Sequence, residues 1–131
     1  MILDSSALLA VILNEADEAR YLEAMIDAPA LRMSAGNWLE STIVVDSLKK
    51  TAVTRRLDDL KAALRIEIVP VTEEAADWGR IAHTAFGRGN HPARLNYGDC
   101  FAYALAKQSK EPLLFKGNDF SQTDIVSALK D

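Results

Sequence analysis

The sequence predicts an α/β fold in three layers, with a mainly parallel central sheet flanked by helices. Short apolar or β-branched runs at 1–3, 30–33, 66–71 and 113–115 alternate with longer segments of helical periodicity. Parallel strands need crossover connections of a dozen or more residues, usually helices, and these spacings supply them. No repeat, low-complexity tract or linker interrupts the pattern, so we expect one domain covering residues 1–131.

The first part of the chain contains the signals for two strands and three helices. Met1 to Leu3 read as a strand, and the following Asp-Ser-Ser is typical of a strand end and a helix cap. A short buried helix is expected over 7–13, and an amphipathic helix over 15–28 ends at Pro29. A second strand is expected over 30–33, after which Ser34 would cap a helix that runs to about Lys50.

The second part continues the alternation. Leucines at 57, 60 and 64 share one face, which predicts a helix over 54–64. Ile66 to Val71 form the clearest strand, β-branched and closed by a proline. Thr72 would open a helix to about Phe86, and Gly98-Asp99 would begin a buried helix. A last strand over 113–115 is followed by a loop over 116–120.

The charge and the cysteine content exclude several classes of protein. The formal net charge of −4 argues against a general binder of polyanions. One cysteine and two histidines cannot make a disulfide or a tetrahedral structural zinc site. The longest apolar stretches, 7–13 and 100–106, are far shorter than the roughly 20 residues of a membrane span. With no basic start of a signal peptide, we expect a cytoplasmic protein.

One segment departs from the acidic average. Between Trp78 and Gly98 there is no Asp or Glu, and the charged or titratable residues are Arg80, His83, Arg88, His91 and Arg94. This segment ends one residue before Asp99. Arginine side chains bind phosphate well, so a local anion-binding surface is predicted beside that acid.

Four acids are candidate site residues: Asp4, Glu40, Asp99 and Asp119. Taken singly, Asp4 and Asp99 are adequately explained as helix caps. Glu40 is followed at helical spacing by Ile43, Val44 and Ser47, which predicts a carboxylate on a largely apolar face. A carboxylate in that position needs a partner, either an arginine or a metal ion.

Together the acids point to one site. Parallel sheets bind ligands at the carboxyl ends of their strands, and Asp4 and Asp119 both follow strands there. Clustered carboxylates require a compensating cation, and hard oxygen ligands select Mg²⁺ or Mn²⁺. An acidic metal site beside a basic strip suits phosphodiester hydrolysis, in which Arg80, Arg88 and Arg94 would hold the nucleic acid strand.

Other chemistries are less well supported. The sequence has no phosphate-binding loop, and Gly87-Arg88-Gly89 completes no dinucleotide fingerprint. Cys100 is better explained as a small core residue than as a nucleophile. A phosphoacceptor signalling domain needs an acidic pair after the first strand, where this chain has Asp4 followed by two serines.

The motifs that carry these acids resemble those of the PIN-domain ribonucleases, specifically the VapC-type toxins of toxin–antitoxin pairs. MILDSSALLA (1–10) is similar to the family's start and places Asp4 as the first metal-binding acid. SAGNWLES (34–41) places Glu40, HPARLNYGDC (91–100) places Asp99, and LLFKGNDFSQTDI (113–125) resembles the closing motif. The likeness covers essentially the whole chain.

The resemblance implies an endoribonuclease dependent on Mg²⁺ or Mn²⁺, toxic when free and silenced by a small VapB-type antitoxin. It also implies a homodimer. The closing loop lacks the Thr or Ser that many relatives carry, which leaves open whether Asn118 or Asp119 supplies the fourth position. The alternative is a catalytically silent PIN-like domain that binds a partner.

Overall fold

The strands form one parallel sheet in the order β3-β2-β1-β4. The computed structural model describes residues 1–129, and its strands are β1 (Ile2–Leu3), β2 (Arg32–Ser34), β3 (Glu67–Val69) and β4 (Leu113–Leu114). Ile2 pairs with Arg32 on one side and with Leu113 on the other. β1 is therefore central, and its carboxyl end lies between those of β2 and β4.

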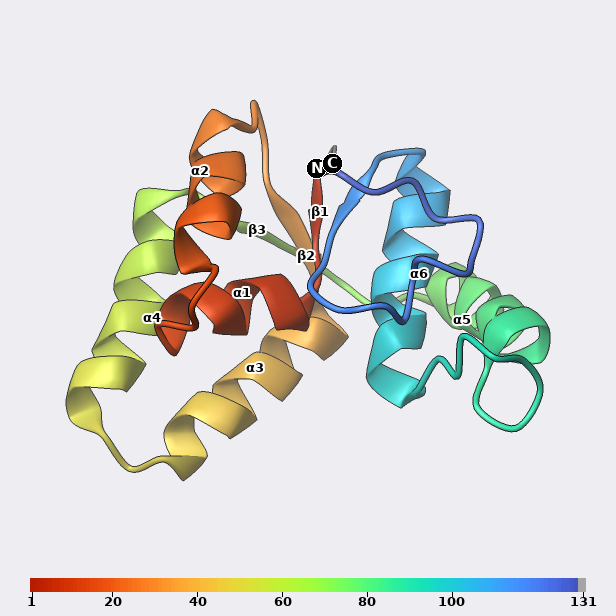
Figure 1. Cartoon of the computed structure of the whole chain (residues 1–131), viewed down its shortest axis with the longest axis horizontal. Helices are drawn as coiled ribbons and strands as arrows, with labels where there is room; N and C mark the ends of the chain where they lie inside the picture. Colours follow the sequence, from red (N-terminus) through yellow and green to blue (C-terminus); the bar gives the residue numbers. More distant parts are fainter. Residues whose placement is uncertain (130–131) are drawn as a thin grey trace.

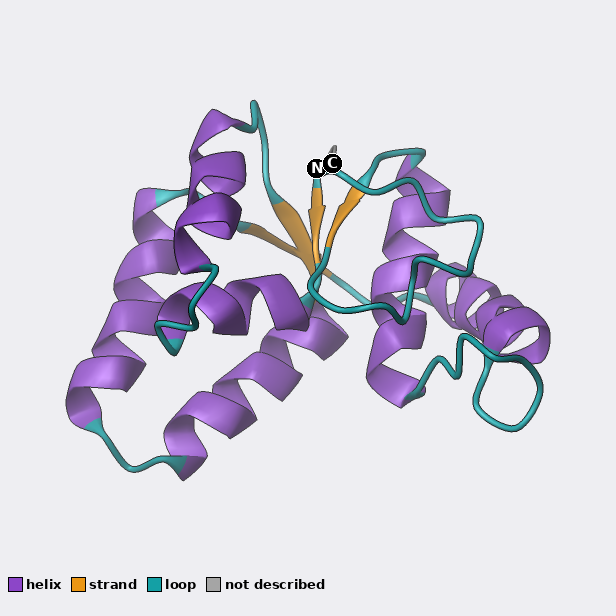
Figure 2. Ribbon diagram, in the orientation of Figure 1, coloured by secondary structure: helices purple, strands orange, loops and turns teal. Residues whose placement is uncertain are grey.

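Helices cover both faces of this sheet (Figures 1 and 2). One layer contains α1 (Ser5–Ile12), α2 (Glu18–Asp27), α3 (Ala35–Ser47) and α4 (Thr51–Ala63). The other contains α5 (Glu73–Phe86) and α6 (Tyr97–Ser109), which pack against each other. The predicted three-layer α/β fold is confirmed.

The pleat of the strands divides the core between the two faces. Ile2 and Leu113 belong to the hydrophobic cluster built with α5 and α6, whereas Leu3 and Leu114 belong to the cluster built with α1 to α4. All four side chains are fully buried. Burying an aliphatic side chain of this kind contributes roughly 1.5–3 kcal/mol, so even two-residue strands are firmly held.

Several element boundaries differ from the predicted ones. β3 ends at Val69 because Pro70 has no N–H to donate to the neighbouring strand. α6 begins at Tyr97, earlier than predicted, and its N-cap is Asn96. α2 begins at Glu18, later than predicted, and α4 begins at Thr51, earlier than predicted.

The connections at the carboxyl edge of the sheet are short. Asp4 follows β1 and caps α1, and α3 starts directly after β2. None of the helices within residues 1–129 is long and apolar enough to cross a membrane.

Candidate active site

Asp4 is buried at the carboxyl end of β1, with 4% of its surface exposed. It is the N-cap of α1, and its Oδ2 accepts hydrogen bonds from the backbone N–H of Ser6 at 3.1 Å and from the Ser6 hydroxyl at 2.5 Å. Burial, assisted by the charge of Glu40, raises the pKa of Asp4 to about 6 against the effect of these bonds. Its negative charge is thus unfavourable in the folded protein without further compensation.

Ser6 connects Asp4 to the loop that follows β4. The backbone N–H of Lys116 donates to Ser6 Oγ at 2.9 Å, while that hydroxyl donates to Asp4. The backbone N–H of Asp4 also donates to the Leu114 carbonyl at 3.0 Å. These bonds hold the start of the closing loop, which carries Asp119, beside the end of β1.

Glu40 lies in the second turn of α3 and reaches the same edge of the sheet. The Ser5 hydroxyl donates to Glu40 Oε1 at 2.6 Å, and the carboxylate lies against Gly98 in the first turn of α6. The prediction that Glu40 projects from a largely apolar face rather than a solvated one is wrong on the second point. Glu40 and the following Ile43 and Val44 are exposed, although the end of the Glu40 side chain contacts Ser5 and Gly98. The observed partner is a serine and not an arginine.

Asp99 is buried in the first turn of α6, with 8% of its surface exposed. It occupies the third helical position of a capping box: Asn96 Oδ1 accepts from the Asp99 N–H at 2.9 Å, and Asp99 Oδ2 accepts from the Asn96 N–H at 3.0 Å. The N-cap is therefore Asn96, which corrects the reading of Asp99 as the cap. This reciprocal pair holds the carboxylate in one orientation.

The electrostatics of Asp99 connect it to two other acids. Burial, together with the charges of Asp4 and Asp119 and a contact with the Asp119 side chain, raises the pKa of Asp99 to about 7 against the effect of the bond from Asn96. The charge of Glu40 in turn raises the pKa of Asp4. The structure thus brings all four predicted acids close enough to influence one another in this chain of neighbours, and Asp119 is the residue of the closing loop that contacts Asp99.

No basic side chain within residues 1–129 forms an ion pair with these four acids. The nearest lysine in sequence, Lys116, pairs instead with Glu15 at 2.5 Å and Asp17 at 2.9 Å. Among the same residues, no group of three or more His, Cys, Asp or Glu side chains is arranged so that it could hold a metal ion. The site is a group of uncompensated carboxylates rather than a salt-bridge network.

Asn37 fastens the two acid-bearing helices to each other. It is completely buried in α3, and its Nδ2 donates to the Gly98 carbonyl at 2.9 Å. Its own carbonyl accepts from the Ser41 hydroxyl at 2.9 Å. Its Oδ1 has no partner among the described residues, so the amide is held by one strong bond from its nitrogen. This bond fixes the first turn of α6 relative to α3.

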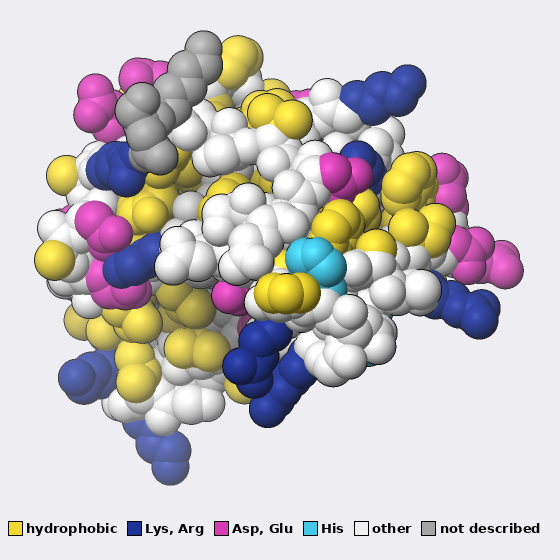
Figure 3. Space-filling view, turned by 45° about the vertical axis from the view of Figure 1, so that its right-hand side comes forward, with side chains coloured by type: hydrophobic (Ala, Val, Ile, Leu, Met, Phe, Trp, Pro, Cys, Tyr) yellow, Lys and Arg dark blue, Asp and Glu magenta, His cyan; other side chains and the backbone are white. Residues whose placement is uncertain are grey.

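A cavity of about 430 Å³ adjoins the acids and is lined by Arg88, Arg94, Asn96, Asn118, Asp119 and Gln122, with Pro92 and Ala93. The face that Figure 3 turns forward carries a group of basic side chains close to a histidine and to an acidic side chain set back from the surface. Arg88 and Arg94 therefore lie where the basic segment was predicted to meet the acids.

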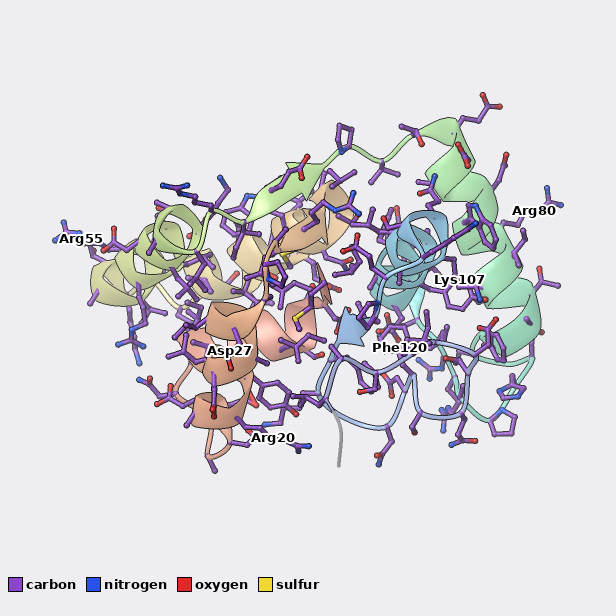
Figure 4. The ribbon with its side chains drawn as sticks, turned by 90° about the horizontal axis from the view of Figure 1, so that it is seen from above. Arg20, Asp27, Arg55, Arg80, Lys107 and Phe120 are labelled. Atoms are coloured by element: carbon purple, nitrogen blue, oxygen red, sulfur yellow. The ribbon has the colours of Figure 1, made fainter. Side chains whose placement is uncertain are left out.

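Arg80 lies elsewhere. It projects from the outer side of α5 (Figure 4) and lines a separate, mostly apolar cavity with His83, Tyr97 and Cys100. The structure does not bring it to the cavity that Arg88 and Arg94 share. α5 ends at Phe86, so Arg88 lies in the loop that follows the helix and not on the helix that carries Arg80.

Comparison with known proteins identifies the family. A family model described as PIN domain matches residues 1–126. Ribonuclease VapC28 of Mycobacterium tuberculosis is 46% identical over 130 residues, which is 98% of each chain. The chain belongs to the PIN-domain family, among its VapC-type ribonuclease toxins.

Solved structures share this PIN fold at low sequence identity. The crystal structure of Mycobacterium tuberculosis VapC20, described as a toxin that cleaves the sarcin–ricin loop, has a TM-score of 0.76 and 13% identity and covers 95% of each chain. A toxin–antitoxin complex from Klebsiella pneumoniae has a TM-score of 0.72 and 16% identity, with 99% of this chain and 98% of that chain covered. The predicted family and fold are confirmed.

Several residues of this PIN site were not recognised in the sequence. Ser5 and Ser6 read only as capping residues, although each hydroxyl contacts a different acid. Asn37, three positions before Glu40, gave no signal of its own, because a polar residue in a helix is usually exposed. The spacing of Asn96 and Asp99 did contain a recognisable signal, because Asn followed three residues later by an acid is a capping-box pattern.

Proposed function

We propose that this PIN-domain chain hydrolyses RNA phosphodiester bonds at Asp4, Glu40, Asp99 and Asp119, with Mg²⁺ or Mn²⁺ held by these carboxylates. The observation that carries the proposal is the burial of Asp4 and Asp99 beside other acids without a basic partner in residues 1–129. Burying such charges is costly, and a divalent cation compensates for it.

The donor set fits a hard divalent ion. All four side chains offer carboxylate oxygens, which Mg²⁺ and Mn²⁺ prefer, and no cysteine or histidine lies among them. Mg²⁺ usually keeps several water ligands and takes only one or two carboxylates directly. Acids that approach in pairs, without forming a closed cage, are therefore compatible with it. When bound, such an ion supplies activation of water and neutralisation of the charge that develops on the phosphate.

The neighbouring residues of this chain orient the carboxylates. Ser5 donates to Glu40, Ser6 donates to Asp4, and the backbone of Asn96 donates to Asp99. Each bond leaves other carboxylate oxygen lone pairs available for a ligand. We assign contact with the RNA phosphates to Arg88 and Arg94, which line the adjoining cavity, and not to Arg80.

Substitution of Asp99 tests the role of the acids. Asp99→Asn keeps the size of the side chain and an oxygen that accepts from the Asn96 N–H, so α6 remains capped. We expect cleavage of total RNA in Mg²⁺ to fall about a hundredfold or more, as when one electrostatic group is removed from an active site. Wild-type cleavage should also stop in EDTA.

Two results would contradict the proposal. Undiminished cleavage by Asp99→Asn would exclude the carboxylate from the chemistry. A folded wild-type protein without EDTA-sensitive cleavage would favour the alternative, a silent PIN-like domain that binds a partner. Circular dichroism of both proteins distinguishes loss of the site from loss of the fold.

We also infer a small VapB-type antitoxin and a homodimeric state for this chain. The structural likeness to a chain of a toxin–antitoxin complex supports the first inference. Exposed apolar side chains on α3, namely Leu39, Ile43 and Val44, support a protein-covered surface. Light scattering of the purified chain, alone and after co-expression with the product of a short neighbouring reading frame, measures both assemblies. A monomer in both samples would contradict the two inferences.

A further inference from the structure

We propose that the cavity beside the acids is a nucleotide subsite that reads the identity of one RNA base next to the cleaved phosphate. In this proposal Arg88 and Arg94 bind phosphate, and the side-chain amides of Asn118 and Gln122 bind the edge of the base. The proposal rests on the ribonuclease function proposed above. It adds which residues set the sequence preference of the cut.

The cavity has the size and the position that such a subsite needs. Its volume of about 430 Å³ lies within the range of roughly 300–1,000 Å³ that is typical of small-ligand sites. Asp119 belongs both to its wall and to the acid group, and Asn96 in the same wall is bonded to Asp99. A nucleotide in this cavity would therefore adjoin the reacting phosphate.

The cavity wall carries charges of both signs. Asp119 belongs to the acid group, and Arg88 and Arg94 line the same cavity. Neither guanidinium group forms a hydrogen bond or an ion pair with any residue in 1–129. Arg32, by contrast, forms an ion pair with Glu111. Two guanidinium groups without protein partners in one cavity are available to bind phosphate oxygens in the bidentate manner that suits their shape.

The loop that carries both arginines is held rigidly. The backbone N–H of Arg88 donates to the Leu95 carbonyl at 3.0 Å, and the Leu95 N–H donates to the Phe86 carbonyl at 2.9 Å. Leu95 is fully buried and Ala93 is 4% exposed, so the loop is anchored in the core. A preformed loop lowers the entropy lost when RNA binds.

Arg94 has an unusual backbone conformation. Its φ is 56°, in the left-handed region. The other non-glycine residues of positive φ within 1–129 follow the ends of helices, namely Asn14, Lys49, Arg65 and Lys110. Arg94 does not follow a helix, and left-handed backbone is unfavourable for such a side chain. Strain of this kind, maintained by the surrounding bonds, is typical of residues that a site requires in one position.

The groups proposed to read the base are the side-chain amides of Asn118 and Gln122. No side-chain hydrogen bond of Asn118 or Gln122 occurs among the described residues, whereas the Asn96 amide oxygen is already used in the cap. Each amide offers a donor and an acceptor side by side, which matches the edge of a base such as adenine. Sequence-specific proteins read unpaired RNA bases by such edge contacts.

Gln122 provides the sharpest test, because it is exposed and lies outside the acid group. The probe is a single-stranded RNA pool with randomised sequence, cut in Mg²⁺ and sequenced at the new ends. We expect a base preference at one position beside the wild-type cut, and Gln122→Ala should reduce that preference about tenfold, within the range of one lost base contact. Gln108→Ala is the control. Gln108 is the other glutamine of the chain and lies on α6, so this variant should cut RNA with the wild-type base preference.

A substitution of Arg94 gives a second test, which concerns the contact with the RNA phosphate rather than the contact with the base. Arg94→Asn removes the charge, and Asn tolerates a positive φ. We expect kcat/KM to fall about tenfold at every sequence, and its dependence on salt to weaken by about 0.7 in log–log slope, as for one lost contact with a single strand. Arg65→Asn is the matched control, because Arg65 has a φ of 51° and is exposed at the end of α4.

The outcomes separate this proposal from the one on which it rests. Cleavage by wild type without any base preference, or an unchanged preference in Gln122→Ala, would overturn base reading by the cavity while leaving the ribonuclease function intact. An Arg94→Asn variant that matches Arg65→Asn would overturn the phosphate contact. Absence of EDTA-sensitive cleavage in wild type would instead overturn the proposed function.

Discussion

The Glu40 carboxylate lies against the backbone of Gly98, so closely that a β-carbon at position 98 would come within 2.3 Å of Glu40 Oε2. α3 carries Glu40 and α6 carries Asp99, and these helices meet at this glycine. Asn37 secures the same contact through its 2.9 Å bond to the Gly98 carbonyl. The placement of two acids thus depends on two residues that carry no charge.

The Gly98→Ala substitution should separate activity from stability. Alanine is more favourable than glycine inside a helix by about 1 kcal/mol, and the obstructing atoms belong to the end of a flexible side chain. We expect Glu40 to move aside, so that the free energy of unfolding changes by less than about 1 kcal/mol. RNA cleavage should fall at least about tenfold, because a displaced catalytic group is costly. Urea unfolding and a cleavage assay measure the two effects.

Gly79→Ala is the matched control, because a β-carbon at 79 would meet Cys100 at an ordinary contact distance of 3.6 Å. It makes the same change in α5. If the two alanine variants cleave RNA equally well, the close approach at Gly98 does not set the position of Glu40.

Ser6→Ala should weaken both the fold and the site. It removes the hydroxyl that donates to Asp4 and leaves the Lys116 N–H without its acceptor. Loss of a partner for a partly buried group costs roughly 1–3 kcal/mol, so we expect the free energy of unfolding to drop by about that amount. Cleavage should fall as well, since Asp4 and the closing loop lose their connection.

Ser6→Thr retains a hydroxyl and should recover part of the activity. Ser47→Ala, at an exposed position of α3, should change the free energy of unfolding by no more than about 0.5 kcal/mol. Equal stability and equal cleavage for Ser6→Ala and Ser47→Ala would show that the serine bridge contributes nothing.

The metal-free protein should lose stability as the pH rises toward neutrality. Burial, with neighbouring charge, raises the pKa of Asp4 to about 6 and that of Asp99 to about 7, from an ordinary value of 3.8. Between these values the folded state binds more protons than the unfolded state, so the free energy of unfolding decreases with increasing pH. Thermal melts in EDTA at about pH 5 and about pH 8 measure this change, which the linkage places mainly below about pH 7.

Mg²⁺ should reverse that loss, because it competes with protons for the same carboxylates. We expect the gain in melting temperature on adding Mg²⁺ to be larger at the higher pH and smaller in Asp99→Asn. Asp17, Glu111 and Asp124 have lowered pKa values, so their contributions to stability disappear only at more acidic pH and do not mask the effect. A stability in EDTA that is constant across this range would contradict the prediction.

The order of the elements and the four acids were readable in the sequence because each leaves a local signal. Apolar runs alternating with helical periodicity indicate a parallel sheet, and the residues directly after parallel strands gather at one edge of such a sheet. The motifs around Asp4, Glu40 and Asp99 also resemble those of the PIN family, to which the chain belongs. These properties depend on residues that are close together in the sequence, so a short stretch of sequence is enough to reveal them.

Only the tertiary structure decided how the acids are held. The bonds from Ser6 to Lys116 and from Asn37 to Gly98 join residues 110 and 61 positions apart. The face of α3 around Glu40 proved exposed despite its apolar side chains, because packing and not periodicity decides which face is covered. Arg80 was separated from Arg88 and Arg94 by the end of α5. Contacts between distant segments arise from the packing of the whole chain, so no local pattern could specify them.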